Sequence, residues 1–303
     1  MTDQDQNNPL LRLNVWSPGN QRALNKPLLV LLALGRLSRG ERALRFVEIE
    51  NELNRLLREF GNQVRKPRAE YSFWRLKNDR IGSTHSKDEK IWSVSPEGFT
   101  PNSKGDVYAK ALRERDAVGR FTDGVLEWLL SDKKILSTAT QQFLDGYFAE
   151  SLHEELLSAV GFTQSEDQSC RRRRDPAFRR AVLDAYQMRC AVCLQDIRIG
   201  SETVGLEAAH IKWHQAGGSD EVANGLSLCS LHHKLFDLGT FTVGENLNIL
   251  VSEHMTGTDQ LDAVLLRFHL QNIRTPTRKE YLPAKVNLIW HREKIFKERP
   301  IEK

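Results

Sequence analysis

The chain has 303 residues, of which 40% are hydrophobic and 28% are charged, and its formal net charge is +4. At roughly 150 residues per domain, this length is enough for two compact domains. The longest apolar run, Pro27–Leu34, is far shorter than the roughly 20 residues of a membrane-spanning helix, and no signal-peptide pattern opens the chain. The composition therefore excludes a membrane protein and predicts a cytoplasmic one.

The first 160 residues predict an α+β domain in which helices dominate. Residues 26–37 form an apolar run that is short enough for one buried helix, and apolar residues in 43–60 repeat at three-to-four spacing. Residues 71–76 and 91–94 are rich in aromatic and β-branched side chains and predict two strands. Helical patterns then return in 106–117, 122–131 and 138–160.

Residues 161–174 are polar, end in four arginines and predict a basic linker. The linker would join a domain over 1–160 to a second domain over 175–303. From Cys170 to Cys190 the chain carries seven arginines and two aspartates. This local positive charge can face phosphates, or it can belong to a solvated linker.

Three of the four cysteines have the spacing of metal ligands. Cys190 and Cys193 form one pair, Cys229 and His232 form a second, and Cys170 stands apart. A cytosolic compartment keeps thiols reduced, so structural disulfides are not expected. Two residues between the members of each pair let both side chains converge from one turn, and four such ligands complete a tetrahedral Zn²⁺ site. The sequence predicts a structural zinc; the alternative is buried free cysteines beside an unrelated histidine.

The elements around this cluster predict a strand pair followed by a helix. Asp175 followed by Pro176 is typical of a helix N-terminus, ahead of the first cysteine pair. Apolar residues alternate in 206–211 and predict a strand that carries His210. Asn224-Gly225 favours a turn before a second short strand, and a helix is expected after Cys229.

Between and after the cysteine pairs lie residues that suit phosphodiester hydrolysis. His210 can act as the base that takes a proton from water. His233 can bind a divalent cation, Mg²⁺ or Mn²⁺, that polarises the scissile phosphate. Asn224 can orient the region of His210 through its side-chain amide. Asp237, four residues after His233, can add a carboxylate to the cation, or it can cap local backbone.

These residues resemble the HNH family, in its McrA-like branch. The resemblance rests on Ala-Ala-His-Ile at 208–211, Asn-Gly-Leu-Ser-Leu-Cys at 224–229 and His-His at 232–233. It implies a ββα-metal nuclease domain in which His210 is the general base, Asn224 the middle Asn and His233 the metal-binding histidine. It also places His232 where many relatives have the second cysteine of the zinc knuckle.

One position departs from the HNH pattern. Many members carry an aspartate metal ligand immediately before the base, and this chain has Ala209 there. The catalytic cation would then rely on His233 together with Asp237, Glu207 or oxygens of the substrate.

The first domain resembles the sulfur-binding domain that is fused to HNH modules in McrA-like restriction enzymes. The resemblance rests on residues 25–35, 70–79 and 91–92, and it spans roughly residues 20–130. Those enzymes recognise phosphorothioate DNA, in which sulfur replaces a non-bridging oxygen of the backbone. Because sulfur is larger, softer and less hydrated than oxygen, a shallow apolar cup beside cationic donors could prefer it.

The resemblance implies four DNA-binding residues in that domain. Tyr71 would form the wall of the cup, although it could equally belong to the core. Ser72 occupies the position where relatives commonly have proline, Lys26 would meet backbone charge, and Lys104 would make another backbone contact.

Three hypotheses follow for the function. The first is a modification-dependent restriction endonuclease that acts on phosphorothioate-modified double-stranded DNA. The second keeps the cleavage but has the first domain read another modification or an unmodified sequence. The third is a zinc-stabilised DNA-binding protein without cleavage, in which His210 and His233 are incidental. One nuclease site per chain would cut both strands through a homodimer or two successive nicks.

Overall fold

The computed structural model describes residues 8–14, 24–61, 66–80, 90–162, 176–200, 202–297 and 299–301. The chain divides into two compact units, Met1–Gln168 and Ser169–Lys303. Beyond its first two residues, the predicted linker 161–174 lies outside the described residues, and so does the predicted helix cap Asp175. In the part of the chain that is described, no helix has the length and apolar character needed to cross a membrane.

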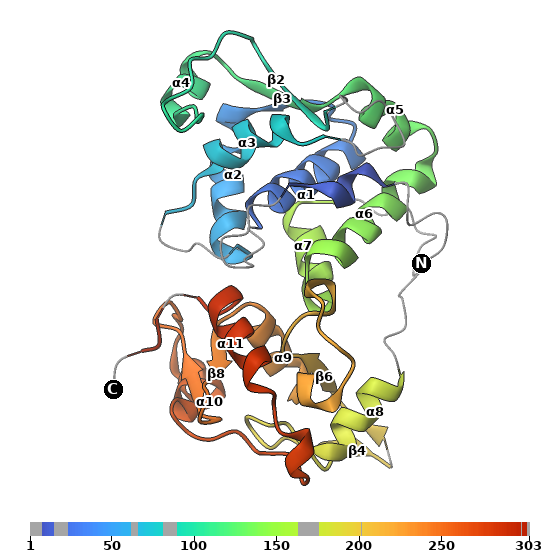
Figure 1. Ribbon diagram of the computed structural model, residues 1–303, viewed down its shortest axis with the longest axis vertical. Coiled ribbons are helices and arrows are strands. Elements are labelled where there is room, and N and C mark those ends of the chain that lie inside the picture. The colour runs from blue at the N-terminus through green and yellow to red at the C-terminus, as the bar shows by residue number, and fades with distance from the viewer. Residues whose placement is uncertain are drawn as a thin grey trace. The chain divides into compact units, whose positions relative to one another are not determined.

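The first unit is built around one buried helix, α1 (Asn25–Ser38). Its apolar run is buried along nearly the whole helix, as the sequence predicts for residues 26–37. Figure 1 shows α1 in the middle of this unit, and three helices pack against it: α2 (Phe46–Glu59), α3 (Ala69–Arg75) and α6 (Lys133–Tyr147). Burying an apolar helix on several sides is the main source of stability that this composition offers.

Helix α3 corrects one prediction, because residues 71–76 were expected to form a strand. They continue α3 into a 3-10 turn, Leu76–Asn78. The buried side chains Ala69, Phe73 and Leu76 recur at three-to-four spacing, so they lie on one helical face against α1 and α2. The aromatic residues favoured a strand locally, but the packing partners decide the structure.

An antiparallel sheet covers this core in the order β1-β3-β2. Its strands are β1 (Leu44–Arg45), β2 (Trp92–Ser95) and β3 (Val118–Phe121), so the strand predicted at 91–94 is confirmed. Trp92 lies opposite Phe121, with ring centroids 5.5 Å apart, and its edge meets Phe73 at 6.1 Å. These rings join the sheet to α3 through edge-to-face contacts.

The other helices of the first unit follow the predicted pattern, except that one predicted helix is divided into two. Helices α4 (Ala109–Glu114) and α5 (Asp123–Leu130) lie inside the two predicted ranges. The single helix expected over 138–160 is instead α6, which begins at Lys133, followed by α7 (His153–Ala159). A 3-10 turn, Glu150–Leu152, separates the two helices.

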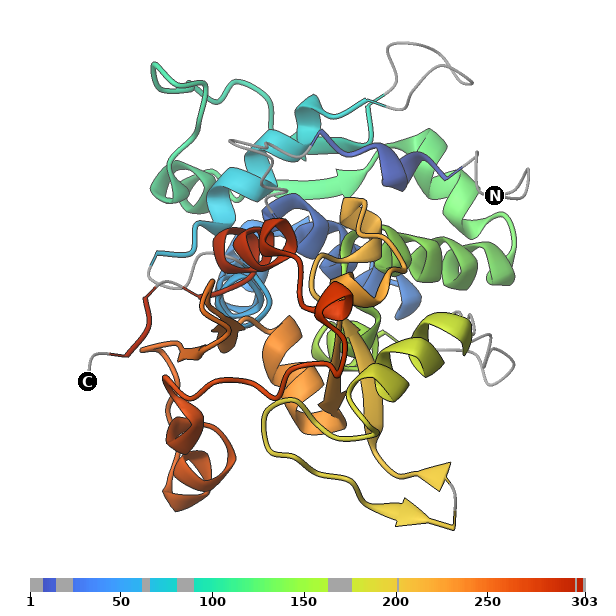
Figure 2. The same ribbon diagram turned by 60° about the horizontal axis from the view of Figure 1, so that its bottom comes forward.

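The second unit contains the predicted strand pair and helix. Strands β6 (Leu206–His210) and β7 (Gly225–Cys229) pair antiparallel with His210 opposite Gly225, and α9 (Ser230–Asp237) follows directly. The elements that surround them are α8 (Pro176–Ala185), β4 (Arg198–Ile199), β5 (Glu202–Thr203), β8 (Phe241–Val243), β9 (Ile249–Val251), α10 (Asp259–Val264) and α11 (Lys285–Lys294). Figure 2 shows the β4–β5 hairpin projecting from this unit.

Helix α11 holds α9 in place through one buried histidine. The ring of His291 stacks on Phe236 of α9 at 3.6 Å between centroids, and its Nε2 donates to the Phe236 carbonyl at 3.1 Å. Its Nδ1 accepts from the Thr242 hydroxyl at 2.9 Å. Burial lowers the pKa of His291 to about 4, so the ring is neutral near pH 7.

The close packing of the aromatic core can be tested at Gly119 of β3. A Cβ added there would lie 2.4 Å from Cζ2 of Trp92 and 2.9 Å from Cε2 of Phe73, both parts of rigid rings. We expect Gly119→Ala to lower the free energy of unfolding by about 1–3 kcal/mol, measured by urea denaturation.

Gly146→Ala is the matched control. Its Cβ would meet only the mobile end of Leu11, at 2.9 Å, and alanine is favoured over glycine inside α6 by about 1 kcal/mol. A Gly119→Ala protein as stable as Gly146→Ala would contradict this description of the core.

Candidate active site

The strand pair and α9 bring together side chains that are far apart in the sequence. Strand β6 ends at His210, β7 begins directly after Asn224, and α9 carries His232, His233 and Asp237. Adjacent residues on a helix point about 100° apart, so His232 and His233 can face two different sites. In the structure, His232 lies with the three cysteines, and His233 lies between Asp237 and Glu207.

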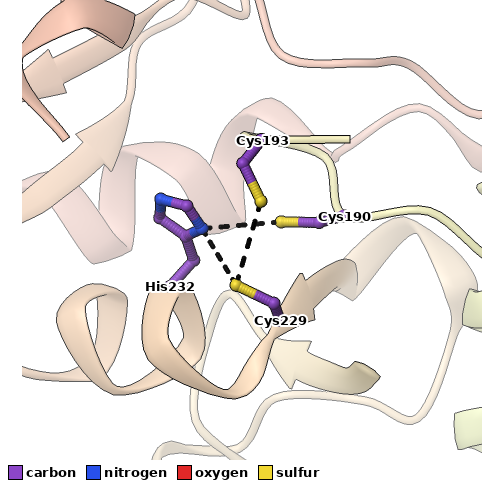
Figure 3. Close-up of side chains that lie close together, drawn as sticks. All are labelled: Cys190, Cys193, Cys229 and His232. Carbon is purple, nitrogen blue, oxygen red and sulfur yellow. Dashed lines mark hydrogen bonds between the residues drawn. The ribbon is translucent and has the colours of Figure 1, made fainter. Parts of the chain in front are cut away.

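The first site is a cluster of three thiols and one imidazole. Figure 3 shows the sulfur atoms of the cysteines and Nδ1 of His232 converging on one point. Cys229 Sγ lies 3.0 Å from His232 Nδ1 and 4.0 Å from Cys193 Sγ, and Cys190 Sγ lies 3.7 Å from the same Nδ1. All four donor atoms lie within 4.8 Å of one another.

The chemistry of this cluster fits zinc. Tetrahedral zinc with bonds of about 2.0–2.3 Å separates its ligand atoms by roughly 3.3–3.8 Å, close to the spacings found here. His232 Nε2 donates to the Val264 carbonyl at 2.9 Å, which leaves the lone pair of Nδ1 directed at the thiols. Hydrogen bonds among the thiols lower the pKa of Cys229 and raise the pKa of Cys190, so the cluster favours the thiolate at Cys229, the form that zinc binds.

The second site begins at His210, at the end of β6. Phe178 of α8 stacks on its ring at 4.1 Å with an interplanar angle of 18°, and Asp220 Oδ1 lies 2.8 Å from its Nε2. With Nε2 donating to Asp220, Nδ1 keeps the lone pair that can accept a proton from water. Burial lowers the pKa of His210, and Asp220 partly offsets that shift, so the imidazole is neutral near pH 7.

Asn224 is buried and organises the loop that leads from His210 to Asp220. Its Oδ1 accepts from the Lys212 amide at 2.9 Å, and its Nδ2 donates to the carbonyls of Lys212 at 3.0 Å and Ser219 at 2.9 Å. One side chain thus ties both ends of the 212–219 loop together. Its contacts in this structure are with backbone groups.

His233 lies between two carboxylates. Its Nε2 is 3.1 Å from Asp237 Oδ2, and its Nδ1 is 2.6 Å from Glu207 Oε2. Ser230 Oγ donates to the other oxygen of Glu207 at 2.9 Å, and Trp213 Nε1 donates to Asp237 Oδ1 at 3.0 Å. These contacts fix both the ring of His233 and the carboxylate of Asp237.

The separation of His233 Nε2 and Asp237 Oδ2 is compatible with two neighbouring ligands of one divalent cation. Neighbouring ligands of an octahedral Mg²⁺ with bonds of about 2.1 Å are about 3.0 Å apart, which fits His233 Nε2 and Asp237 Oδ2. Glu207 contacts the other ring nitrogen of His233, Nδ1, so it orients the imidazole and leaves Nε2 for the cation. Ala209 is fully buried in β6 and offers no ligand.

The four predicted DNA-binding residues of the first unit have different surroundings. Lys26 pairs with the buried carboxylate of Asp79 at 2.5 Å and donates to the Asn14 carbonyl at 2.8 Å, so its charge is used within the unit. Ser72 is 2% exposed and its hydroxyl donates to the Ala69 carbonyl, so the structure does not bring it to the surface.

Tyr71 and Lys104 belong to neighbouring surface elements. Tyr71 is partly exposed on α3, and Lys104 is exposed in a turn that follows Asn102. Trp74 Nε1 donates to the Gly105 carbonyl at 2.9 Å, and the guanidinium of Arg75 binds Asp106, so α3 is tied to the turn that carries Lys104.

Sequence reasoning missed two residues of the His210 site. Asp220 lies ten positions after His210 in a polar loop, and no spacing rule links the two. Phe178 belongs to an amphipathic helix, where an aromatic residue is expected to be part of the hydrophobic core. Only the fold brings both side chains to the imidazole.

The strand pair, the helix that follows it and the two side-chain clusters define the class of the second unit, a ββα-metal nuclease. Residues 6–165 match the family described as ScoMcrA-like, DNA sulfur-binding domain, and residues 190–244 match the HNH endonuclease family. The chain belongs to the ScoMcrA-like family of DNA sulfur-binding domain proteins. Its second unit is an HNH endonuclease domain, so the expected α+β fold with a nuclease module is confirmed.

Several solved structures resemble this chain. The sulfur-binding domain of SprMcrA, complexed with phosphorothioated DNA, is 22% identical over 53% of this chain and 94% of that chain, with a TM-score of 0.41. The Type IV phosphorothioation-dependent restriction endonuclease ScoMcrA is 19% identical over 53% of this chain and 32% of that chain, with a TM-score of 0.41. The modification-dependent restriction endonuclease TagI is 16% identical over 73% of this chain and 61% of that chain, with a TM-score of 0.31. No protein of curated function matches the sequence.

Metal binding by the thiol cluster can be tested with Cys193→Ser. Losing one of four ligands should sharply reduce the zinc content of the purified protein and lower its thermal midpoint, because binding to a structural site contributes on the order of 10 kcal/mol to folding. Cys170→Ser, which changes a cysteine outside the cluster, should keep the zinc content of the unaltered chain. Equal zinc in both variants, measured by elemental analysis, would contradict the assignment.

Asp220 can be tested through the pH dependence of DNA cleavage. Its carboxylate raises the pKa of His210, so Asp220→Asn should lower that pKa further and move the acidic limb of the pH–rate profile to lower pH. His214 and Asp237 also act on this pKa and stay unchanged. We expect the plateau rate to fall about tenfold as the ring loses its orientation.

The neighbouring exposed acid provides the control for Asp220. Glu221→Gln removes one negative charge from the same loop and should leave both the plateau and the limb in place. A slower Asp220→Asn enzyme with an unshifted limb would show that Asp220 acts on the loop and not on His210.

Proposed function

We propose that this protein is a modification-dependent restriction endonuclease that recognises phosphorothioate-modified double-stranded DNA and hydrolyses phosphodiester bonds nearby. The observation that carries the proposal is the presence in one chain of a DNA sulfur-binding domain, residues 6–165, and an HNH endonuclease domain, residues 190–244. In this proposal the recognition domain spans 1–160, the linker 161–174 and the nuclease domain 175–303.

His210, Asn224 and His233 are the proposed catalytic residues. His210 takes a proton from the attacking water at Nδ1, while Asp220 holds its Nε2 and Phe178 supports its ring. Asn224 keeps the 212–219 loop in the shape that places Asp220 against that ring.

His233 and Asp237 are the proposed ligands of the catalytic cation. Mg²⁺ or Mn²⁺ held there would polarise the scissile phosphate and stabilise the leaving oxygen. Glu207 holds Nδ1 of His233, so that Nε2 is the nitrogen directed to the cation. The absence of a ligand at Ala209 leaves coordination positions for oxygens of the substrate.

Zinc is the proposed structural ion, bound by Cys190, Cys193, Cys229 and His232. It would join the turn after α8 to the junction of β7 and α9. The four proposed DNA-binding residues are Lys26, Tyr71, Ser72 and Lys104. Tyr71 and Lys104 reach the surface, whereas Lys26 is paired with Asp79 and Ser72 is buried, which makes these two the weaker candidates. Since each chain carries one such nuclease site, cleavage of both strands calls for a homodimer or two successive nicks.

The proposal predicts that recognition and cleavage can be separated by His210→Ala. We expect cleavage to fall at least about 100-fold, because the general base is lost, and DNA binding to persist. The control is His254→Gln, which changes a partly exposed histidine of the same unit and should leave cleavage at its normal rate. Binding would be measured by fluorescence anisotropy and cleavage on denaturing gels.

The inactive His210→Ala protein also tests the ligand. It should bind a duplex with one phosphorothioate of the correct configuration more tightly than the same duplex without sulfur. Cleavage retained by His210→Ala would overturn the catalytic assignment, and equal affinities would overturn sulfur recognition.

A further inference from the structure

Tyr71 has two arginines over its ring. The Cζ atoms of Arg68 and Arg75 lie 5.0 Å and 4.9 Å from the ring centroid, within the range of cation–π contacts. Arg68 Nη1 also donates a hydrogen bond to the Tyr71 hydroxyl. The side chain that is expected to meet sulfur is therefore accompanied by positive charge.

The charge of Arg75 is neutralised by an ion pair with Asp106. Its Nε and Nη2 donate to the two oxygens of Asp106 at 2.5 Å and 2.6 Å, and Asp106 is 2% exposed. These hydrogen bonds raise the pKa of Arg75 and hold its guanidinium in one place. Arg75 is a positioning residue, because moving it toward a DNA anion would leave a buried carboxylate unpaired.

The charge of Arg68 is not bound to a buried carboxylate in the same way: burial raises the pKa of the neighbouring Glu70, and Arg68 offsets part of that shift without forming an ion pair with it. Its side chain is exposed, and it forms no ion pair in the part of the chain that the structure describes. One of its five N–H donors binds the Tyr71 hydroxyl, which leaves the others for a ligand. Lys26, by contrast, is paired with Asp79.

We propose that Arg68 is the residue that binds the charged oxygen of the phosphorothioate, while the ring of Tyr71 meets its sulfur. This inference rests on the proposed function and assigns the two non-bridging atoms of one phosphate to two neighbouring side chains. A guanidinium prefers the harder, better hydrogen-bonding oxygen, and an aromatic ring accommodates the softer sulfur.

Arg68→Gln separates charge from sulfur selectivity. In full-length protein carrying His210→Ala, we expect the affinity for a duplex with one phosphorothioate of defined configuration to fall about tenfold, as for a lost charged hydrogen bond. The slope of log affinity against log salt should decrease by about 1, because one phosphate contact is lost. Arg68→Lys should restore the slope.

The matched control is Arg55→Gln, an exposed arginine of α2 that pairs with Glu59. It should change neither the affinity nor the salt slope. A thermal midpoint for each variant equal to that of the parent protein shows that the fold is intact.

The outcomes separate this inference from the proposed function. If the parent protein prefers the sulfur-containing duplex and Arg68→Gln binds it with unchanged affinity and slope, the Arg68 assignment is wrong and sulfur recognition stands. If the parent protein binds both duplexes equally, sulfur recognition fails. A smaller slope for Arg68→Gln in that case still supports a phosphate contact at Arg68.

Discussion

The geometry of the nuclease unit depends on the four-ligand cluster that joins β7 to α9. Cys229 ends the strand and His232 lies in the first turn of the helix, so a zinc ion bound to both would fix the rotation of α9 about its axis. That rotation directs the next residue, His233, at Glu207 of β6, and it directs Asp237, one turn further along α9, at Trp213. The proposed structural zinc would thus decide where His233, the proposed ligand of the catalytic cation, points.

Helix α8 packs against the strand pair, and His291 of α11 packs against α9. At one end of β6 and β7, Cys229 lies opposite Leu206, and at the other end Gly225 lies opposite His210. Helix α8 packs so closely against this second end that Gly225 has no room for a side chain: a Cβ there would lie 2.4 Å from Val182 of α8. Helix α8 therefore packs tightly enough to stack Phe178 on His210, and the ring of His291 stacks on Phe236 of α9.

The sequence was most informative where spacing alone determines contact. The cysteine pairs, the strand carrying His210 and the i, i+4 relation of His233 and Asp237 could be predicted, because each depends on a local repeat or a turn. The strand expected at 71–76 was wrong, since aromatic residues suit a helix equally well when α1 and α2 bury one face. Asp220 depends on a tertiary contact, which no local pattern records. Arg68 and Arg75 were missed for another reason: they meet Tyr71 at i−3 and i+4 spacing, which brings side chains together only in a helix and not in the strand that was expected there.

The most direct test of the account is cleavage by the unaltered full-length protein of two duplexes that are identical except for one sulfur atom. With Mg²⁺ or Mn²⁺ present, the two labelled duplexes would compete in one reaction, and the cut positions would be mapped on a sequencing gel. The account predicts cleavage of the sulfur-containing duplex, near the modification, with the unmodified duplex left largely intact. Equal cleavage of both duplexes would contradict it.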